Sequence, residues 1–511
     1  MAARLAGCVA LVCTMAVAAK AEPSSPLSAI DWLSNSVTTE EAAVPPTETA
    51  PSATAPGAVR VLPLDAPVPD SAGLRPAGEI GLPFDLWGRS AAGDLAEGLS
   101  RIRVGRDTPP SVVTFLTELP KVRLAPPIDA AVDARFFFAR VDRLLEKGHL
   151  TAAQALMDAA NLDDARAFRR SFDIALLTGT ETEACRQIEQ TPDLSPTYPA
   201  RIFCLARLGQ FDVAALTLGN AETLGILSER EDALLLHFLD PELFEGDPIP
   251  PAPRVPTPLQ FRLYEAAGDR ISTEGLPLPF AHADLSMTVG WKARLIAAER
   301  LATTGAVSFA QLLDVYQERG PSASGGVWDR IRATTALTDA IANGDDTRIT
   351  TALPGAWASA SQLGYGGALA GWLQPSLAAL GEPGRASHVA FEIALTAGDA
   401  ESAARFSNTS EEDQFLLSIA TGQPGSVPAR DALGRAVLRG LSLSSAGPTY
   451  EALIADDRRG EALLRALGQL ADGASGNPSS TTQSLTVLRR LGLDAFARQI
   501  AVELILKEGA A

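Results

Sequence analysis

Hydrophobic residues recur along most of this 511-residue chain at the spacing of an α-helix. In residues 132–148, for example, Phe136, Val141, Leu144 and Leu145 fall near one stripe of a helix with 3.6 residues per turn. Similar patterns, separated by short breaks, occupy residues 81–240 and 261–511. No segment alternates apolar and polar residues as a half-buried strand does. The pattern predicts an all-α protein.

A proline-rich stretch at residues 241–260 interrupts these helical patterns. Proline lacks a backbone N–H and breaks a helix interior. We therefore expect this stretch to be a crossing between an N-terminal helical region, 81–240, and a C-terminal one, 261–511.

Several predicted helix pairs share a glycine that is followed five residues later by an alanine. Glycine readily forms the left-handed turn that ends a helix, and a small alanine lets the next helix pack closely. The first three glycines are 31 and 30 residues apart. The pairs are Gly148 and Ala153, Gly179 and Ala184, Gly209 and Ala214, Gly305 and Ala310, Gly398 and Ala403, and Gly492 and Ala497.

This pairing resembles the tetratricopeptide and related helical-repeat families, in which helix A ends near glycine and alanine opens helix B. The resemblance is closer over residues 130–240 than over 290–505, and most aromatic and proline positions of the repeat are absent. It implies an α-solenoid of degenerate helical hairpins, with a concave surface for peptides or partner domains.

The first 21 residues have the features of a secretory signal peptide. Arg4 precedes an apolar run at 5–19, and Ala19-Lys20-Ala21 is a typical cleavage site. Cys8 lies in a Leu-x-Gly-Cys sequence like that of lipoproteins, but it precedes the apolar run, so soluble export is favoured. We expect a periplasmic protein with no stable membrane span after cleavage.

Two segments separate the signal peptide from the helical regions. Residues 38–80 are rich in Pro, Ala, Thr and Glu and are predicted to be a disordered linker. Residues 22–37 are predicted to form a short amphipathic helix that binds a partner, either this protein's own solenoid or another protein. Its apolar stripe consists of Leu27, Ile30, Leu33 and Val37, with Trp32 beside it.

Two of the four cysteines, Cys8 and Cys13, belong to the signal peptide. The other two, Cys185 and Cys204, lie at similar distances before and after a proline-flanked break between predicted helices. An even pair in an exported chain indicates a disulfide. Their wide spacing speaks against the alternative, a reactive redox pair.

Charge narrows the range of partners. The formal net charge is -18, with no basic block, which argues against nucleic acid or anionic lipid as a partner. The uncharged stretch 355–381 is interpreted as a buried helical hairpin; a membrane span is the alternative.

The chain holds no recognisable catalytic or metal-binding motif. Its four histidines are scattered, without metal-ligand spacing. His282 and Asp284 form a His-x-Asp sequence in a proline-flanked loop, which is more typical of a capped turn than of a catalytic pair. We therefore predict no catalytic residue, no cofactor and no metal.

These observations favour a non-enzymatic periplasmic scaffold that binds one or more envelope proteins. The layout of signal peptide, acidic proline-rich linker and degenerate helical repeats resembles the MotC-type proteins of bacterial flagellar motors, which implies support of stator function. The alternative is a peptidoglycan-related protein. It would be either a lytic transglycosylase-like enzyme, with Glu451 as its candidate acid, or an activator of cell-wall synthases. The oligomeric state stays open.

Overall fold

The structure is a computed structural model that describes residues 68–509, apart from 131–132, 163, 382–383, 409 and 474–475. The predicted signal peptide, the 22–37 segment with its five stripe residues and most of the predicted linker lie outside the described residues. The described part is almost entirely helical, as the all-α prediction requires.

The folded body begins within the stretch that the sequence assigns to the linker. Residues 69–80 form short elements because the buried guanidinium of Arg140 donates hydrogen bonds to the carbonyl groups of Asp70, Ala72 and Val122. The Asp70 carboxylate in turn accepts from the backbone N–H of Phe137. The elements of this N-terminal part are η1 (Pro69–Ser71), β1 (Arg75–Pro76), η2 (Ala77–Ile80), α1 (Ala92–Arg101), α2 (Pro110–Glu118), η3 (Leu119–Lys121) and β2 (Val122–Arg123), with β1 parallel to β2.

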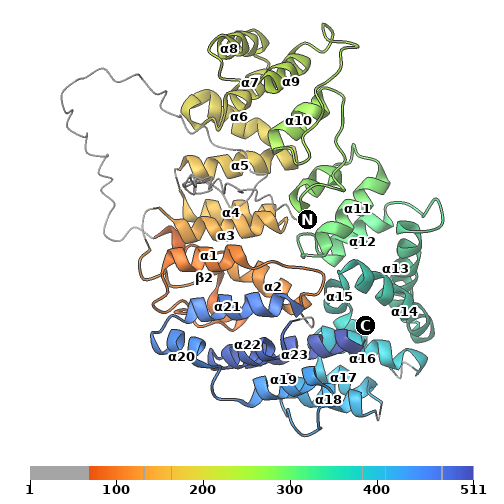
Figure 1. Ribbon diagram of the computed structural model, residues 1–511. Helices are drawn as coiled ribbons and strands as arrows, with labels where there is room; N and C mark the ends of the chain where they lie inside the picture. The colour runs from red at the N-terminus through yellow and green to blue at the C-terminus, as the bar shows by residue number, and fades with distance from the viewer. Residues whose placement is uncertain are drawn as a thin grey trace, which may run out of the picture.

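The next helices form a branch in which each helix packs on its neighbour in sequence, and this branch ends at α8 (Figure 1). After α9 the chain returns through a stretch without helix at residues 241–257, and α10 packs back on α5. The elements are α3 (Arg135–Glu146), α4 (Leu150–Ala160), α5 (Ala165–Thr178), α6 (Glu181–Gln190), η4 (Pro192–Leu194), α7 (Tyr198–Arg207), α8 (Phe211–Thr223), α9 (Glu229–Leu239) and α10 (Pro258–Ala266).

The remaining helices descend on the other side and curve back beneath the N-terminal part (Figure 1). They are η5 (Leu278–Leu285), α11 (Trp291–Ala302), α12 (Phe309–Gln317), α13 (Val327–Ala342), α14 (Asp346–Leu363), α15 (Gly366–Ala379), η6 (Gly384–Ala386), α16 (Ser387–Thr396), α17 (Ala400–Phe406), α18 (Glu411–Ala420), α19 (Ala432–Ser442), α20 (Pro448–Ala455), α21 (Arg459–Ala471), α22 (Pro478–Arg490) and α23 (Asp494–Gly509).

The helices of the described chain follow an arc, and its first and last helices are in contact, so the arc is closed. Helix α1 packs on α21, and α2 packs on both α21 and α23. Phe115 of α2 stacks on Phe496 of α23 with ring centroids 4.5 Å apart. The hydroxyl of Thr108 donates to the carbonyl of Ala471 at 2.6 Å, and Lys507 donates to the carbonyl of Arg106 at 2.8 Å. We call this contact between residues 82–118 and 457–507 the closure interface.

The glycine turns form between helices as predicted, because every glycine of the six pairs has a positive φ. Four of the paired alanines are fully buried, and Ala184 is partly buried. Ala310 is exposed, so the pattern fails there. The reason is local: Ser308 and Gln311 form a capping box that delays the start of α12 to Phe309.

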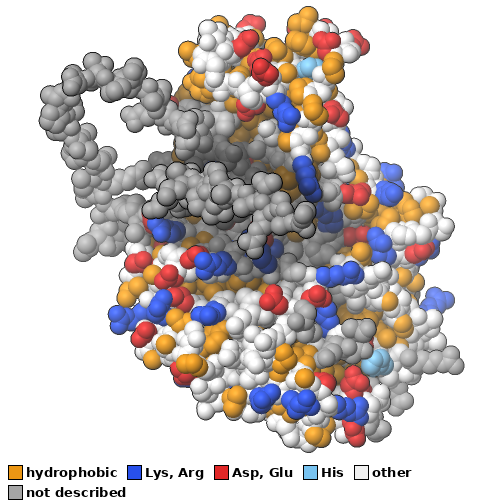
Figure 2. Space-filling model, viewed as in Figure 1, with side chains coloured by type: hydrophobic (Ala, Val, Ile, Leu, Met, Phe, Trp, Pro, Cys, Tyr) orange, Lys and Arg blue, Asp and Glu red, His pale blue; other side chains and the backbone are white. Residues whose placement is uncertain are grey.

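The uncharged stretch forms a helical hairpin as predicted, with α14 and α15 joined at Gly364. The hairpin is buried on one side only: Leu369 and Leu373 are buried, whereas Gln362 and Gln374 are exposed. Among the described residues, none of the helices combines the length and the apolarity that a membrane span requires. Acidic and basic side chains are interspersed over the face in view in Figure 2.

Cys185 of α6 and Cys204 of α7 form the predicted disulfide across a helical hairpin, with 4.8 Å between their Cα atoms. Both residues are buried in the core of the branch. The bond closes a loop across 19 positions, and in the chain-entropy model a loop of this size stabilises a protein by about 3 kcal/mol.

Replacing both cysteines, Cys185→Ser with Cys204→Ser, should therefore lower the free energy of unfolding by about 3 kcal/mol. Urea unfolding monitored by circular dichroism measures this. Wild-type protein treated with dithiothreitol is the matched control and should show the same loss. An unchanged midpoint in both samples would contradict the stabilising role.

Candidate functional site

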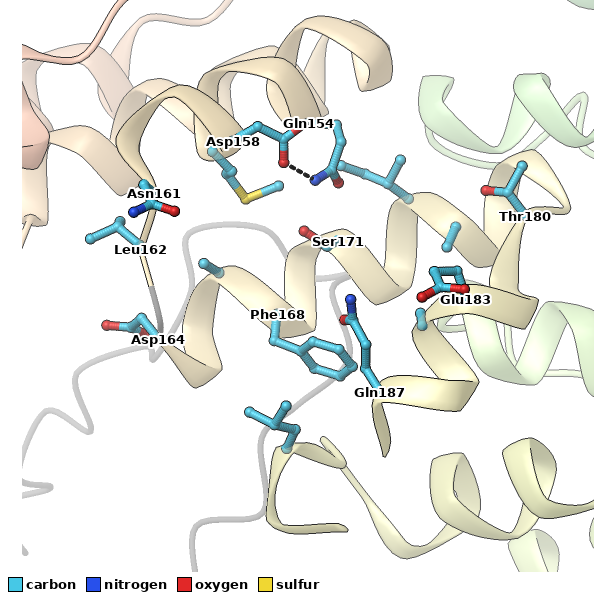
Figure 3. Close-up of a pocket in the computed structure, with 16 residues that line it drawn as sticks. Gln154, Asp158, Asn161, Leu162, Asp164, Phe168, Ser171, Thr180, Glu183 and Gln187 are labelled. Atoms are coloured by element: carbon cyan, nitrogen blue, oxygen red, sulfur yellow. Dashed lines mark hydrogen bonds between the residues drawn. The ribbon is translucent and has the colours of Figure 1, made fainter. Parts of the chain in front are cut away.

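A groove of about 590 Å³ crosses three successive helices, α4, α5 and α6 (Figure 3). Met157, Phe168 and Ile174 supply apolar surface, and the rim carries hydroxyl, carboxamide and carboxylate groups. The polar lining residues are Gln154, Asp158, Asn161, Asp164, Ser171, Thr180, Glu183 and Gln187. Apolar surface with a few polar groups around it is the usual composition of a binding site.

Local sequence sets the shape of this groove. Helix α4 ends at Ala160, and Asn161 directly after it takes the left-handed conformation that closes a helix. Helix α5 begins after Asp164, whose carboxylate accepts from the N–H of Arg166. Figure 3 shows Gln187 of α6 beside the ring of Phe168 on α5, and the Gln154 amide donating to Asp158 at 2.8 Å.

The groove lining is acidic. Its carboxylates are Asp158, Asp164 and Glu183, and none of the lining residues is Lys or Arg. Arg166 and Arg186 pair with Asp164 and Glu183, but neither arginine is part of the lining. A segment that carries both apolar and basic side chains would match this surface in polarity and in charge.

A larger cavity, about 1130 Å³, lies where distant parts of the chain converge. Its wall includes the loop before α2, the α3–α4 turn, the end of α11, the α14–α15 turn and the last turns of α23. It therefore exists only because the closure interface brings α2 and α23 together. Its aromatic and ionisable lining residues are Arg106, Asp107, Glu118, Glu146, Lys147, His149, Arg330, Trp357, Tyr365, Glu392, Glu503 and Lys507.

Glu503 connects the cavity to the closure interface. Its carboxylate accepts from the N–H and hydroxyl of Ser111, at 3.0 and 2.7 Å, and from the amide of Gln499 at 3.0 Å. It therefore satisfies a backbone N–H at the start of α2 that has no partner within the helix. Glu503 is only 7% exposed, and burial raises the pKa of its carboxyl group to about 7 despite these hydrogen bonds.

Neighbouring polar groups of the cavity are also engaged within the protein. Tyr316 donates to Glu299 at 2.6 Å, and Arg330 binds the same carboxylate through two nitrogens. Tyr365, whose hydroxyl lies 3.1 Å from that of Tyr316, has a pKa raised to about 12 by burial. This network fixes α11, α12, α13 and the α14–α15 turn relative to one another.

The histidine of the cavity has a structural contact. His149 lies with Nε2 2.9 Å from the carbonyl oxygen of Thr304, and burial lowers its pKa to about 4. It is therefore neutral at pH 7 and joins the α3–α4 turn to the end of α11. Within the described part of the chain, no group of three His, Cys, Asp or Glu residues is arranged to hold a metal ion.

The structure separates the residues that the sequence offered for chemistry. His282 contacts the carbonyl of Gly148, whereas Asp284 accepts from Arg270 and Thr273. Glu451 lies on α20, where hydrogen bonds from Arg490 and the Ala446 N–H lower its pKa. A lowered pKa is the opposite of what a general acid requires.

Sequence reasoning did not find the groove or Glu503. Phe168, Ser171 and Ala175 follow helical spacing, but the same spacing describes a core face, and nothing in the sequence pairs Ser111 with Glu503.

No protein-family model, curated protein or solved structure matches this chain.

The raised pKa of Glu503 gives a test of its surroundings. The folded protein binds this proton more tightly than the unfolded chain, so ionisation of Glu503 destabilises the fold as pH rises from about 4.5 to about 7. The neutral variant Glu503→Gln should be more stable than wild type at pH 8, by on the order of 3 kcal/mol, and the difference should vanish by pH 4. Chemical denaturation at several pH values measures it.

The control is Glu503→Ala, which leaves the Ser111 N–H without a partner. It should be less stable than the Gln variant at every pH, by about 1–3 kcal/mol. A difference between wild type and the Gln variant that does not change with pH would contradict the burial of an ionisable carboxyl here.

Proposed function

We propose that this protein is an exported, periplasmic scaffold that binds a segment of an envelope protein in the α4–α6 groove and has no catalytic activity of its own. The main support for this proposal is the groove, in which three successive helices form one surface that is both apolar and acidic. Degenerate tetratricopeptide-like repeats would use such a surface for peptide binding. The signal-like first 21 residues and the disulfide support export.

The partner segment would present apolar side chains to Phe168 and Ile174, and lysine or arginine to the rim carboxylates. Carboxamide groups of Gln154 and Gln187 both donate and accept hydrogen bonds, so they suit the backbone of an extended or helical segment. We propose support of the flagellar motor and its stator as the process, because of the overall layout of the chain.

A photo-crosslinking amino acid at Gln187 should capture an envelope protein in living cells. Ser171→Arg, which places a bulky cation inside the groove, should reduce the crosslinked product at least tenfold. Ser442→Arg is the matched control, because Ser442 is an exposed serine on α19, far from the groove. A product that survives Ser171→Arg unchanged would contradict binding in this groove.

The flagellar assignment has its own test. A deletion strain should lose motility or fail to recruit stator units, as scored on soft agar and by fluorescence microscopy of labelled stators. Normal motility together with normal recruitment would remove this assignment and leave the groove proposal intact.

One observation favours a second candidate, a peptidoglycan-related function. The cavity is large enough for a small ligand and combines Trp357 and Tyr365 with the buried carboxyl of Glu503. Incubation with purified peptidoglycan would release anhydro-muropeptides if the protein cleaved glycan strands, and Glu503→Gln should abolish that release. Glu451→Gln is the matched control. No release by wild-type protein would reject the enzymatic version.

A further inference from the structure

Helix α8 lies at the free end of the branch (Figure 1), and it exposes several apolar side chains. Leu216 and Leu224 are 67% and 71% exposed, and Phe211, Val213 and Ile226 are exposed beside them. The opposite face of the helix, with Ala214, Leu218 and Ala221, is buried against α7 and α9. Helical spacing places Val213, Leu216 and Leu224 in a row along one side of the exposed surface, whose other residues are mostly polar, Asp212 and Asn220 among them. The outermost helix of a helical stack normally has a polar outer face, so this apolar row is unusual.

Gly219 lies on this same outer face. It is in the middle of α8, has ordinary helical backbone and is exposed, and a Cβ built on it would meet no atom within 4 Å. Glycine is unfavourable in a helix interior, and here neither a turn nor internal packing requires it. Together with the exposed Ala215, one turn earlier, it makes a shallow strip beside the row of Leu216 and Asn220, on which the backbone of another helix fits closely.

We propose that residues 27–37 of the same chain cover this outer face of α8 as a short helix. The chain offers a matching surface, because Leu27, Ile30, Leu33 and Val37 form one stripe, with Trp32 beside it. A helix of about twelve residues is marginally stable alone and gains its stability by burying that stripe. This inference goes beyond the groove proposal and does not depend on it.

The length of the connecting chain permits this contact. The described residues begin at 68, beside α3, where Asp70 contacts Phe137. Packed helices lie 8–10 Å apart, so the five steps from α3 to α8 span at most about 50 Å. Thirty residues, 38–67, average about 30 Å as a flexible coil and reach about 90 Å as an extended polyproline chain.

A tether of this length also favours the chain's own segment over other occupants. An attached segment has an effective concentration near the millimolar range, which a second copy or an external helix reaches only at high protein concentration. An external partner for α8 would then have to displace residues 27–37.

Hydrogen exchange on the full-length mature protein tests the proposal. Amides of residues 211–226 should exchange at least tenfold faster in the double variant Trp32→Ser with Leu33→Ser than in wild type. Reciprocally, Leu216→Ser with Leu224→Ser should speed exchange in residues 27–37. Leu443→Ser, at an exposed leucine after α19, is the control and should change neither segment.

Two further measurements distinguish residues 27–37 from a second copy of the chain as the occupant of this face. A synthetic peptide of residues 24–38, added to the Trp32 and Leu33 variant, should restore protection of 211–226 in a saturable way. Protection in wild type should not depend on protein concentration. Equal exchange of residues 211–226 in wild type and in the Trp32 and Leu33 variant would overturn the proposal. Protection that rises with protein concentration would also overturn it and would assign the surface to a second copy.

Discussion

The contact between the first and last helices of the described chain determines the shape of the whole molecule. An open stack of helix pairs needs only contacts between neighbours, whereas here α1 and α2 pack on helices about 350–400 positions later in the sequence. The approach is close enough to demand a glycine: a Cβ on Gly473, which has a positive φ, would lie 1.9 Å from the carbonyl oxygen of Asp107. The central cavity follows from this contact, since α2 and α23 are both part of its wall.

The free branch has the opposite character. Helices α6–α9 are held by neighbouring helices, by the disulfide and by the return of α10 onto α5. They are not part of the closure interface. The groove and the exposed face of α8 both lie on this branch, so the surfaces we connect with binding are on the part of the molecule that extends away from the closed arc. The closed arc therefore forms a base from which the branch extends (Figure 1).

Local features of this fold could be predicted from the sequence, and distant ones could not. Helical spacing, the turn glycines such as Gly179 and Gly209, and the pairing of Cys185 with Cys204 depend on residues close together in the chain. The closure interface depends on pairs such as Ser111 with Glu503, and single polar residues in unrelated helices leave no pattern in one sequence. The folded body begins before the predicted end of the linker for the same reason: Asp70 and Ala72 are held by Arg140, a distant contact that a proline-rich composition does not reveal. The groove was missed because Phe168 has the spacing of a core residue, and only the packed structure distinguishes a half-covered aromatic ring from a buried one.

Closure of the arc is the claim on which both the cavity and the division into base and branch depend. Its most direct test is a distance measurement by pulsed electron spin resonance between nitroxide labels at Glu97 of α1 and Arg435 of α19, both of which are exposed. We expect a single narrow distribution centred on the separation in the structure, unchanged by Cys185→Ser with Cys204→Ser, because the disulfide lies in the branch. A broad distribution extending to longer distances would show that the two ends separate in solution, and it would contradict the closed arc.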